Sequence, residues 1–313
     1  MPLPTPGAVS PSEVTSLEPD GLRLASAAAP IVCGIDDAYV LPWQTLAASI
    51  AAAHPVVATR PRMIVLHAGL SGSSRRAVAR CADLLGLAVE LRQVSDVGIR
   101  YPVSGWVSKA AYLRLAIGDA VGDEPMVLYL DADTLVVRDL GPLLHQSLDG
   151  ALIGAVRDPQ NPAVGTGLAL PGCERIGVPR GRDYFNSGVM LLDLAACAEL
   201  GVFDLARRFL ARFPDEVRLW DQDALNVAVD DRWQRLDRCW NTFAMSALAV
   251  QPGFFHHTAE PIMPLDDLLA DEYTAAVLHF AGPVKPWHEE YPSVPLRRLY
   301  RRFLPAPALA GAR

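Results

Sequence analysis

The stretch MVLYLDADTLVV, from Met126 to Val137, decides the fold. Its first half is continuously apolar, which predicts a strand buried on both faces in the middle of a sheet. Two acids, Asp131 and Asp133, follow at the end of this apolar run. Because side chains alternate along a strand, both carboxylates turn to the same side while Ala132 points away. The two carboxylates can therefore hold one divalent cation between them.

Short β-rich runs alternate with helical stretches on the N-terminal side of this strand. Strands are expected at residues 30–35, 62–68 and 88–94, and helices at residues 43–53, 75–85 and 108–119. On the C-terminal side we expect a strand at 188–194, a helix at 203–213 and an apolar strand at 275–280. Strands separated by helices usually pair in parallel. The sequence therefore predicts an α/β fold with a mostly parallel central sheet and helices on both faces.

Acids and a histidine stand where the predicted strands end. In open α/β sheets, ligands bind in the crevice beyond the carboxyl ends of the strands. Asp36 follows the first strand, Asp131 and Asp133 follow the central one, and His279 lies near the end of the last. Carboxylates suit Mg²⁺ or Mn²⁺, and an imidazole shifts the preference toward Mn²⁺. The alternative is that the two acids form a solvated turn and that His279 is a core histidine.

Composition excludes several classes of function. The chain has 313 residues, a formal net charge of −7 and a pI near 5.5, which argues against nucleic acid as a partner. Five cysteines are widely spaced without a C-x-x-C pair, so the sequence indicates neither a disulfide framework nor a zinc site. A reducing, cytoplasmic location fits best.

The two ends of the chain differ from the region between them. Residues 1–28 are rich in Pro, Ser and acids without periodicity, which predicts a disordered tail without the features of a secretory leader. Residues 29–290 form the predicted catalytic domain. Residues 291–313 are basic and aromatic, which predicts a C-terminal tail with at most weak peripheral contact to a membrane surface.

The pattern D-x-D-x-T after an apolar strand also looks like the nucleophile loop of haloacid-dehalogenase-type phosphatases. In that interpretation Asp131 accepts the phosphoryl group, Asp133 is a general acid, and Asp230 and Asp231 help to hold Mg²⁺. That motif normally opens its domain, whereas about a hundred residues of sheet-forming sequence precede Asp131 here.

Six blocks, in order, resemble the family 8 glycosyltransferases, the retaining group that contains bacterial lipooligosaccharide galactosyltransferases and glycogenin. The resemblance covers residues 30 to 288 approximately. The blocks are IVCGIDDAYVLPWQTLAASI, SKAAYLRLAIGD, VLYLDADTLVVRDL, YFNSGVMLLDL, LWDQDALN and HFAGPVKPW. Each block is weak alone, but six in sequence are specific. The resemblance implies a GT-A type nucleotide-sugar-binding fold and transfer of glucose or galactose from a UDP-sugar to an acceptor hydroxyl.

The resemblance also implies a role for each matching residue. Those expected to bind Mn²⁺, or alternatively Mg²⁺, are Asp131, Asp133 and His279. Those expected at the nucleoside are Gly34, Ile35, Asp36 and Tyr39, and those at the diphosphate are Gly282 and Lys285. Ala132, between the two acids, is also expected to contact the donor. The expected sugar-binding residues are Arg114, Asn186, Ser187, Asp221 and Gln222, of which Asp221 and Gln222 are the catalytic candidates.

Simpler structural interpretations stand beside these roles. Asp36 could cap a helix, Arg114 could lie on a solvated face, and Asp221 could cap the next helix. Ala38 and Ala48 stand where the family often has a polar residue and a lysine, which keeps a non-catalytic UDP-sugar-binding module as an alternative. A scaffolding protein is a third one. The acceptor, whether glycan, lipid, protein or small molecule, is not indicated by the sequence, because acceptor pockets are built from variable loops.

Overall fold

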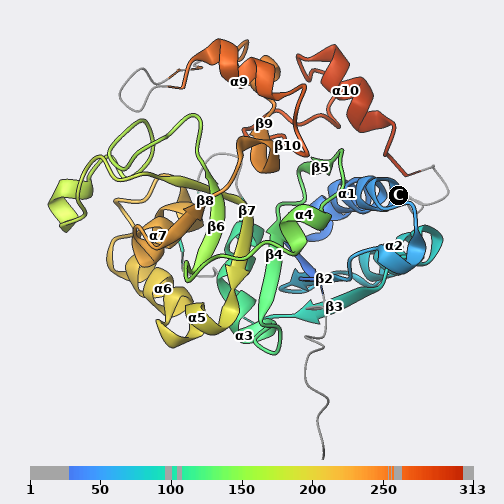
Figure 1. The fold of residues 1–313 in the computed structure, drawn as a ribbon, viewed down its shortest axis with the longest axis horizontal. Helices are drawn as coiled ribbons and strands as arrows, with labels where there is room; N and C mark the ends of the chain where they lie inside the picture. The colour runs from blue at the N-terminus through green and yellow to red at the C-terminus, as the bar shows by residue number, and fades with distance from the viewer. Residues whose placement is uncertain are drawn as a thin grey trace, which may run out of the picture.

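The computed structural model describes residues 28–95, 101–103, 108–252, 254, 256 and 263–305. Apart from Ala28, the predicted N-terminal tail lies outside the described residues. Within them, the chain forms a seven-stranded sheet, a smaller three-stranded sheet and the helices that cover them (Figure 1).

The seven-stranded sheet confirms the predicted α/β class. Its strand order is β3-β2-β1-β4-β7-β6-β8. The pairs β1/β2, β2/β3, β1/β4 and β6/β8 are parallel, whereas β7 runs antiparallel to both β4 and β6. The strands span Ile31–Gly34 (β1), Met63–His67 (β2), Val89–Gln93 (β3), Met126–Leu130 (β4), Ile153–Arg157 (β6), Phe185–Asp193 (β7) and Trp233–Arg235 (β8).

The stretch Met126 to Val137 differs from the expected single strand. It contributes β4 to the large sheet and β5 (Thr134–Val136) to the small one, whose order is β5-β10-β9. β5 pairs antiparallel with β10 (Val277–His279), and β10 pairs parallel with β9 (Thr242–Phe243). The intervening Asp-Ala-Asp therefore crosses from one sheet to the other. Its backbone is anchored on both sides, because Asp131 N–H donates to Gly188 O (2.8 Å) and Phe280 N–H donates to Asp133 O (3.0 Å).

Helices cover both faces of the large sheet, as expected. Figure 1 shows α1 (Val40–Ala53) and α2 (Gly72–Leu85) on one side, with α5 (Leu194–Glu199), α6 (Val202–Arg212) and α7 (Trp220–Val229) on the other. Alternating strand residues supply the two cores: Ile31 packs with Trp43 of α1, and Val32 belongs to the core beneath α5 to α7. The segment expected as a helix at 108–119 is mostly a 3-10 helix, η3 (Lys109–Ala116), followed by α3 (Ile117–Ala120).

The C-terminal segment packs on the small sheet. Leu296 and Tyr300 of α10 (Val294–Arg301) are buried against Leu135 of β5 and Phe280 after β10. The predicted domain boundary at residue 290 stays a prediction. The remaining helices are α4 (Gly141–Leu144), α8 (Met245–Leu248), α9 (Leu265–Asp271) and the 3-10 turns η1 (Asp37–Tyr39), η2 (Val57–Thr59), η4 (Cys173–Ile176) and η5 (Arg238–Asn241). Within the described ranges, no helix is long and apolar enough to span a bilayer.

Candidate active site

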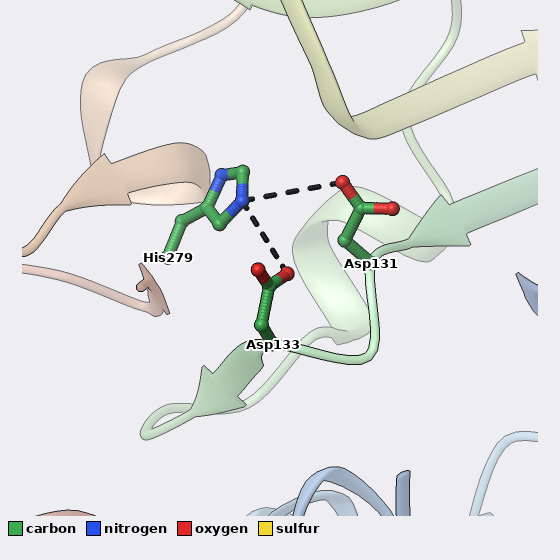
Figure 2. Close-up of side chains that lie close together, drawn as sticks. All are labelled: Asp131, Asp133 and His279. Carbon is green, nitrogen blue, oxygen red and sulfur yellow. Dashed lines mark ion pairs between the residues drawn. The ribbon is translucent and has the colours of Figure 1, made fainter. Parts of the chain in front are cut away.

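Two carboxylates and an imidazole meet where the two sheets join. Figure 2 shows Asp131 at the end of β4, Asp133 just before β5 and His279 at the end of β10. Nε2 of His279 lies 4.0 Å from Asp131 Oδ2 and 3.6 Å from Asp133 Oδ1. One ligand atom from each residue lies within 4.8 Å of the other two. The three side chains can therefore contact one divalent cation, and their mixed O and N donors suit Mn²⁺.

A glycine on the neighbouring strand leaves room for this group. A Cβ at Gly188 of β7 would overlap Cε1 of His279 and lie 2.9 Å from Asp131 Oδ2. Real Cβ atoms do not approach other atoms so closely, so any larger residue would push the histidine or the aspartate aside. The position of Gly188 thus fits a three-ligand cation site better than an ordinary strand interior.

Arg114 is buried between two carboxylates. Its side chain comes from η3 and is 5% exposed, so the alternative of a solvated arginine is wrong. One guanidinium NH₂ donates to Asp131 Oδ1 (2.7 Å), Nε lies 2.9 Å from Asp221 Oδ2, and the other NH₂ donates to Ser187 Oγ (2.8 Å). Burial raises the pKa of Asp221 to about 6, and the charge of Arg114 opposes this rise. Arg114 therefore orders both acids and offsets their charge.

The wall beside Arg114 is a polar network from β7 and α7. Oε1 of Gln222 accepts from Nδ2 of Asn186 (2.8 Å) and from the backbone N–H of Ser187 (3.0 Å). Nε2 of Gln222 donates to Asp158 Oδ2 (3.0 Å). The hydroxyl of Ser187 donates to Asp221 (3.2 Å). All these groups are buried, and together they present fixed donors and acceptors of the kind that bind sugar hydroxyls.

Lys285 lies beside this group of three side chains and pairs with Asp133. Its Nζ lies 2.5 Å from Asp133 Oδ2, donates to Phe280 O (2.8 Å), and the residue is 6% exposed. Burial acts to raise the pKa of Asp133, but the charge of Lys285 and the contact with His279 hold it below its usual value. Gly282 nearby has φ +94°, a conformation that glycine adopts without strain. A buried ammonium group and a glycine turn suit the approach of a phosphate.

These groups line one cavity of about 430 Å³. Tyr39 and Gly34 stand in its wall. Ile35 and Asp36 have other surroundings: Ile35 is fully buried in the core, and Oδ1 of Asp36 accepts from the N–H groups of Ala38 and Tyr39 as an N-cap. The capping alternative for Asp36 is thus confirmed as a contact, and its role at the nucleoside stays a prediction.

The cavity carries an excess of negative charge. Among the described residues that line it, four carboxylates (Asp131, Asp133, Asp158 and Asp221) outnumber two cationic side chains (Arg114 and Lys285). Such a cavity repels a diphosphate unless a divalent cation enters with it. The excess of negative charge in the cavity therefore favours binding of a divalent cation, as does the geometry of Asp131, Asp133 and His279.

Sequence reasoning missed two polar residues of this site, Asp158 and Asn241. Asp158 follows β6, whose apolar run at 151–156 is separated from the acid by Arg157, so the signal was weaker than the run directly before Asp131. Asn241 donates from Nδ2 to Asn186 Oδ1 (2.9 Å) and contacts His279 Nδ1 through Oδ1 (3.0 Å). No local pattern marks Asn241, because its partners are distant in the sequence.

The N-cap of α7, Leu219, has no side-chain cap, and Asp223 rather than Asp221 binds the backbone that leads into the helix. Oδ2 of Asp223 accepts from the N–H groups of Arg218 (2.7 Å) and Leu219 (2.8 Å), while Oδ1 accepts from the hydroxyl of Tyr184 (2.6 Å). Asp223 is fully buried, whereas Asp221 lines the cavity. Burial raises the pKa of Asp223 to about 6 despite these hydrogen bonds.

This raised pKa predicts a pH dependence of stability. An unfolded aspartate loses its proton near pH 4, so between about pH 4 and 6 the folded state binds more protons, and unfolding becomes easier as pH rises through this window. Asp223→Asn removes the effect. Urea unfolding measures the free energy of unfolding across this range. We expect the value for the variant to increase by up to about 3 kcal/mol relative to that of wild type between pH 4 and 6, and the difference to stay constant above pH 6. A pH-independent difference would contradict the assignment.

The strand order of the large sheet and the group formed by Asp131, Asp133 and His279 at the ends of its strands fit a glycosyltransferase of the GT-A type. Residues 30–291 match the model of Glycosyl transferase family 8, and the chain belongs to this family. It is an enzyme of glycosyl transfer, as the resemblance implied. The phosphatase alternative is not favoured, and Asp230 and Asp231 form ion pairs with Arg182 and Arg235.

Relatives agree with this assignment. The chain is 26% identical over 232 residues to "General stress protein A" of Bacillus subtilis (strain 168), covering 72% of this chain and 76% of that protein. It is 29% identical over 223 residues to "Lipopolysaccharide 1,2-glucosyltransferase" of Escherichia coli (strain K12), covering 69% of this chain and 61% of that protein. The crystal structure of the galactosyltransferase LgtC with donor and acceptor sugar analogs has a TM-score of 0.70 and 28% identity, covering 88% of this chain and 95% of that one.

Proposed function

We propose that this protein transfers glucose or galactose from a UDP-sugar to an acceptor hydroxyl, with retention at the anomeric carbon and in dependence on Mn²⁺. One observation carries the proposal: Asp131, Asp133 and His279 converge beside buried Lys285 in the cavity that Asn186, Asp221 and Gln222 also line. Mg²⁺ is the alternative ion, because two of the three ligands are carboxylates.

The contacts in the cavity support a separate role for each group of residues that lines it. Asp131, Asp133 and His279 would hold the cation, which supplies positive charge to a diphosphate leaving group. Lys285 and Gly282, with the backbone at Ala132, would receive the diphosphate, and Tyr39 with Gly34, Ile35 and Asp36 the nucleoside. Arg114, Asn186, Ser187, Asp221 and Gln222 would surround the hexose. LgtC, a galactosyltransferase by its name, and the relative named as a glucosyltransferase support a hexose, and do not choose between the two.

The contacts of Gln222 and Asp221 favour front-face transfer. Oε1 of Gln222 already accepts two hydrogen bonds, and Asp221 lies in an ion pair with Arg114, so both are held as binding groups rather than free nucleophiles. In front-face transfer the bond from the anomeric carbon to the phosphate oxygen breaks and its electron pair leaves with UDP. The acceptor oxygen bonds to the same face of that carbon, and its proton passes to the departing phosphate oxygen.

Binding of UDP tests the site directly. We expect UDP to raise the melting temperature of the purified protein only when Mn²⁺ is present, and Asp133→Asn to lose this increase, because it removes a charged ligand. The same measurement with Mg²⁺ in place of Mn²⁺ identifies the ion that the site prefers. No Mn²⁺-dependent effect of UDP on the wild-type protein would refute the proposed site.

Replacement of Lys285 isolates the diphosphate contact. In Lys285→Met we expect the affinity for UDP in saturating Mn²⁺ to fall by about 10- to 100-fold, since a charged hydrogen bond contributes about 1.5–3 kcal/mol. Calorimetric titration measures the change. Arg80→Met, which removes an exposed cation on α2, is the control and should bind UDP as wild type does. Equal affinities for the Lys285 and Arg80 variants would show that Lys285 does not contact the diphosphate.

We also propose a class of acceptor and a cellular location. The lipopolysaccharide glucosyltransferase among the relatives supports a glycan or lipid-linked acceptor, with a small molecule as the alternative. A cytoplasmic enzyme would meet UDP-sugars, and the exposed Arg298 and Arg302 at the C-terminal end offer a weak contact to an anionic membrane surface.

A further inference from the structure

A line of buried side chains connects the cation site to the sugar-binding wall. Oδ1 of Asn241 lies 3.0 Å from Nδ1 of His279, and Nδ2 of Asn241 lies 2.9 Å from Oδ1 of Asn186. Nδ2 of Asn186 then lies 2.8 Å from Oε1 of Gln222, whose Nε2 lies 3.0 Å from Oδ2 of Asp158. The four residues from His279 to Gln222 come from β10, η5, β7 and α7, and each is at most 7% exposed.

Three groups at fixed positions determine which way each amide points. The carboxylate of Asp158 accepts hydrogen bonds, so the NH₂ of Gln222 must face it. The backbone N–H of Ser187 donates to Oε1 of Gln222 (3.0 Å), and the backbone N–H of Gly188 donates to Oδ1 of Asn186 (3.0 Å). A backbone N–H is only a donor, so it places the oxygen of each amide independently of Asp158.

The orientation of Asn241 follows from this sequence of donors and acceptors. Since the oxygen of Asn186 faces Asn241, Asn241 must turn its NH₂ toward Asn186 and its oxygen toward His279. Nδ1 of His279 then donates a hydrogen to that oxygen, so in the neutral ring Nε2 carries the lone pair. Nε2 makes no competing hydrogen bond to the two acids, because it lies 3.6 and 4.0 Å from their oxygens.

We propose that Asn241 is a positioning residue that fixes the tautomer of His279, with the Nε2 lone pair directed at the space between Asp131 and Asp133. The inference rests on the proposed function in one respect, that this space receives the divalent cation. Hydrogen bonds of this kind to a ligand histidine hold the ring in place and raise its basicity. Asn241 itself lies outside the reach of the cation and acts only through His279.

The affinity for Mn²⁺ without nucleotide tests this role. In Asn241→Leu, which has a similar size and no acceptor oxygen, we expect the dissociation constant for Mn²⁺, measured by electron paramagnetic resonance, to rise by about 10- to 100-fold. Thr242→Val is the matched control: it removes the hydrogen bond from the adjacent buried Thr242 to Arg238 O, and should leave Mn²⁺ binding unchanged. Unchanged binding in Asn241→Leu, with binding by wild type, would overturn the role of Asn241 alone. No binding by wild type would refute the proposed cation site.

A measurement on the wild-type protein does not depend on the folding of a variant. In protein labelled with ¹⁵N-histidine and free of Mn²⁺, the ring signals of His279 can be assigned by their loss in His279→Gln. We expect a hydrogen on Nδ1 and a bare Nε2. The opposite tautomer would overturn the proposal whatever the variants show.

Discussion

Replacing Gly188 with alanine is expected to reduce Mn²⁺-dependent activity by about 100-fold or more, since displacement of a reacting or ligating group by about 1 Å can cost that much. The added Cβ would overlap the ring of His279 and lie 2.9 Å from Asp131 Oδ2, so the three ligands could no longer converge. The affinity for Mn²⁺ should fall with the activity, because the substitution acts on the ligands. Release of UDP from the donor and Mn²⁺ titration measure the two effects.

The control for this variant is Gly69→Ala, at an exposed glycine whose added Cβ would meet nothing within 4 Å. It should retain both Mn²⁺ binding and activity. If Gly188→Ala bound Mn²⁺ with the affinity of wild type, the three residues would not share one cation, and the interpretation of the close contact at Gly188 would be wrong.

The second large effect concerns stability. Arg114→Met is expected to lower the free energy of unfolding by about 3–5 kcal/mol, because it leaves two carboxylates without their buried partner. The carboxylates are Asp131 and Asp221, 2.7 and 2.9 Å from the guanidinium. Urea unfolding without Mn²⁺ and UDP gives this value, since a bound cation would replace part of the lost charge.

Arg207→Met provides a matched comparison. Arg207 also pairs with two aspartates, Asp119 and Asp204, but its side chain is 26% exposed and theirs are mostly exposed. Exposed ion pairs contribute about 0–1 kcal/mol, so this variant should be nearly as stable as wild type. Equal decreases in the free energy of unfolding of the two variants would contradict the view that burial makes the ion pairs of Arg114 necessary for stability.

Much of the site was predictable because its residues stand at the ends of strands. The apolar run before Asp131 identified the central strand β4. Strand alternation predicted that Asp131 and Asp133 would turn to the same side, but residues 131–133 form a turn between β4 and β5, and it is this turn that brings the two carboxylates beside His279. His279 was predictable in the same way, from the run at 275–280. These signals are local, because a strand that is buried on both faces of a sheet appears in the sequence as a continuous apolar run.

The rest depended on contacts between distant segments. β5, β9 and β10 have only two or three residues each, too few for a periodic pattern, so the second sheet was not predicted. Asn241 owes its role to Asn186 and His279, which are 55 and 38 residues away. For Asp36, the structure confirms the capping contact with η1, and its role at the nucleoside stays a prediction.

The most direct test of the central claim is the release of UDP from UDP-glucose and UDP-galactose by the purified protein, with and without Mn²⁺. We predict slow release from one of the two donors, only in the presence of Mn²⁺ and absent in Asp133→Asn. Mn²⁺-dependent binding of UDP without turnover of either donor would contradict catalysis of hexosyl transfer and would instead support a non-catalytic UDP-sugar-binding module.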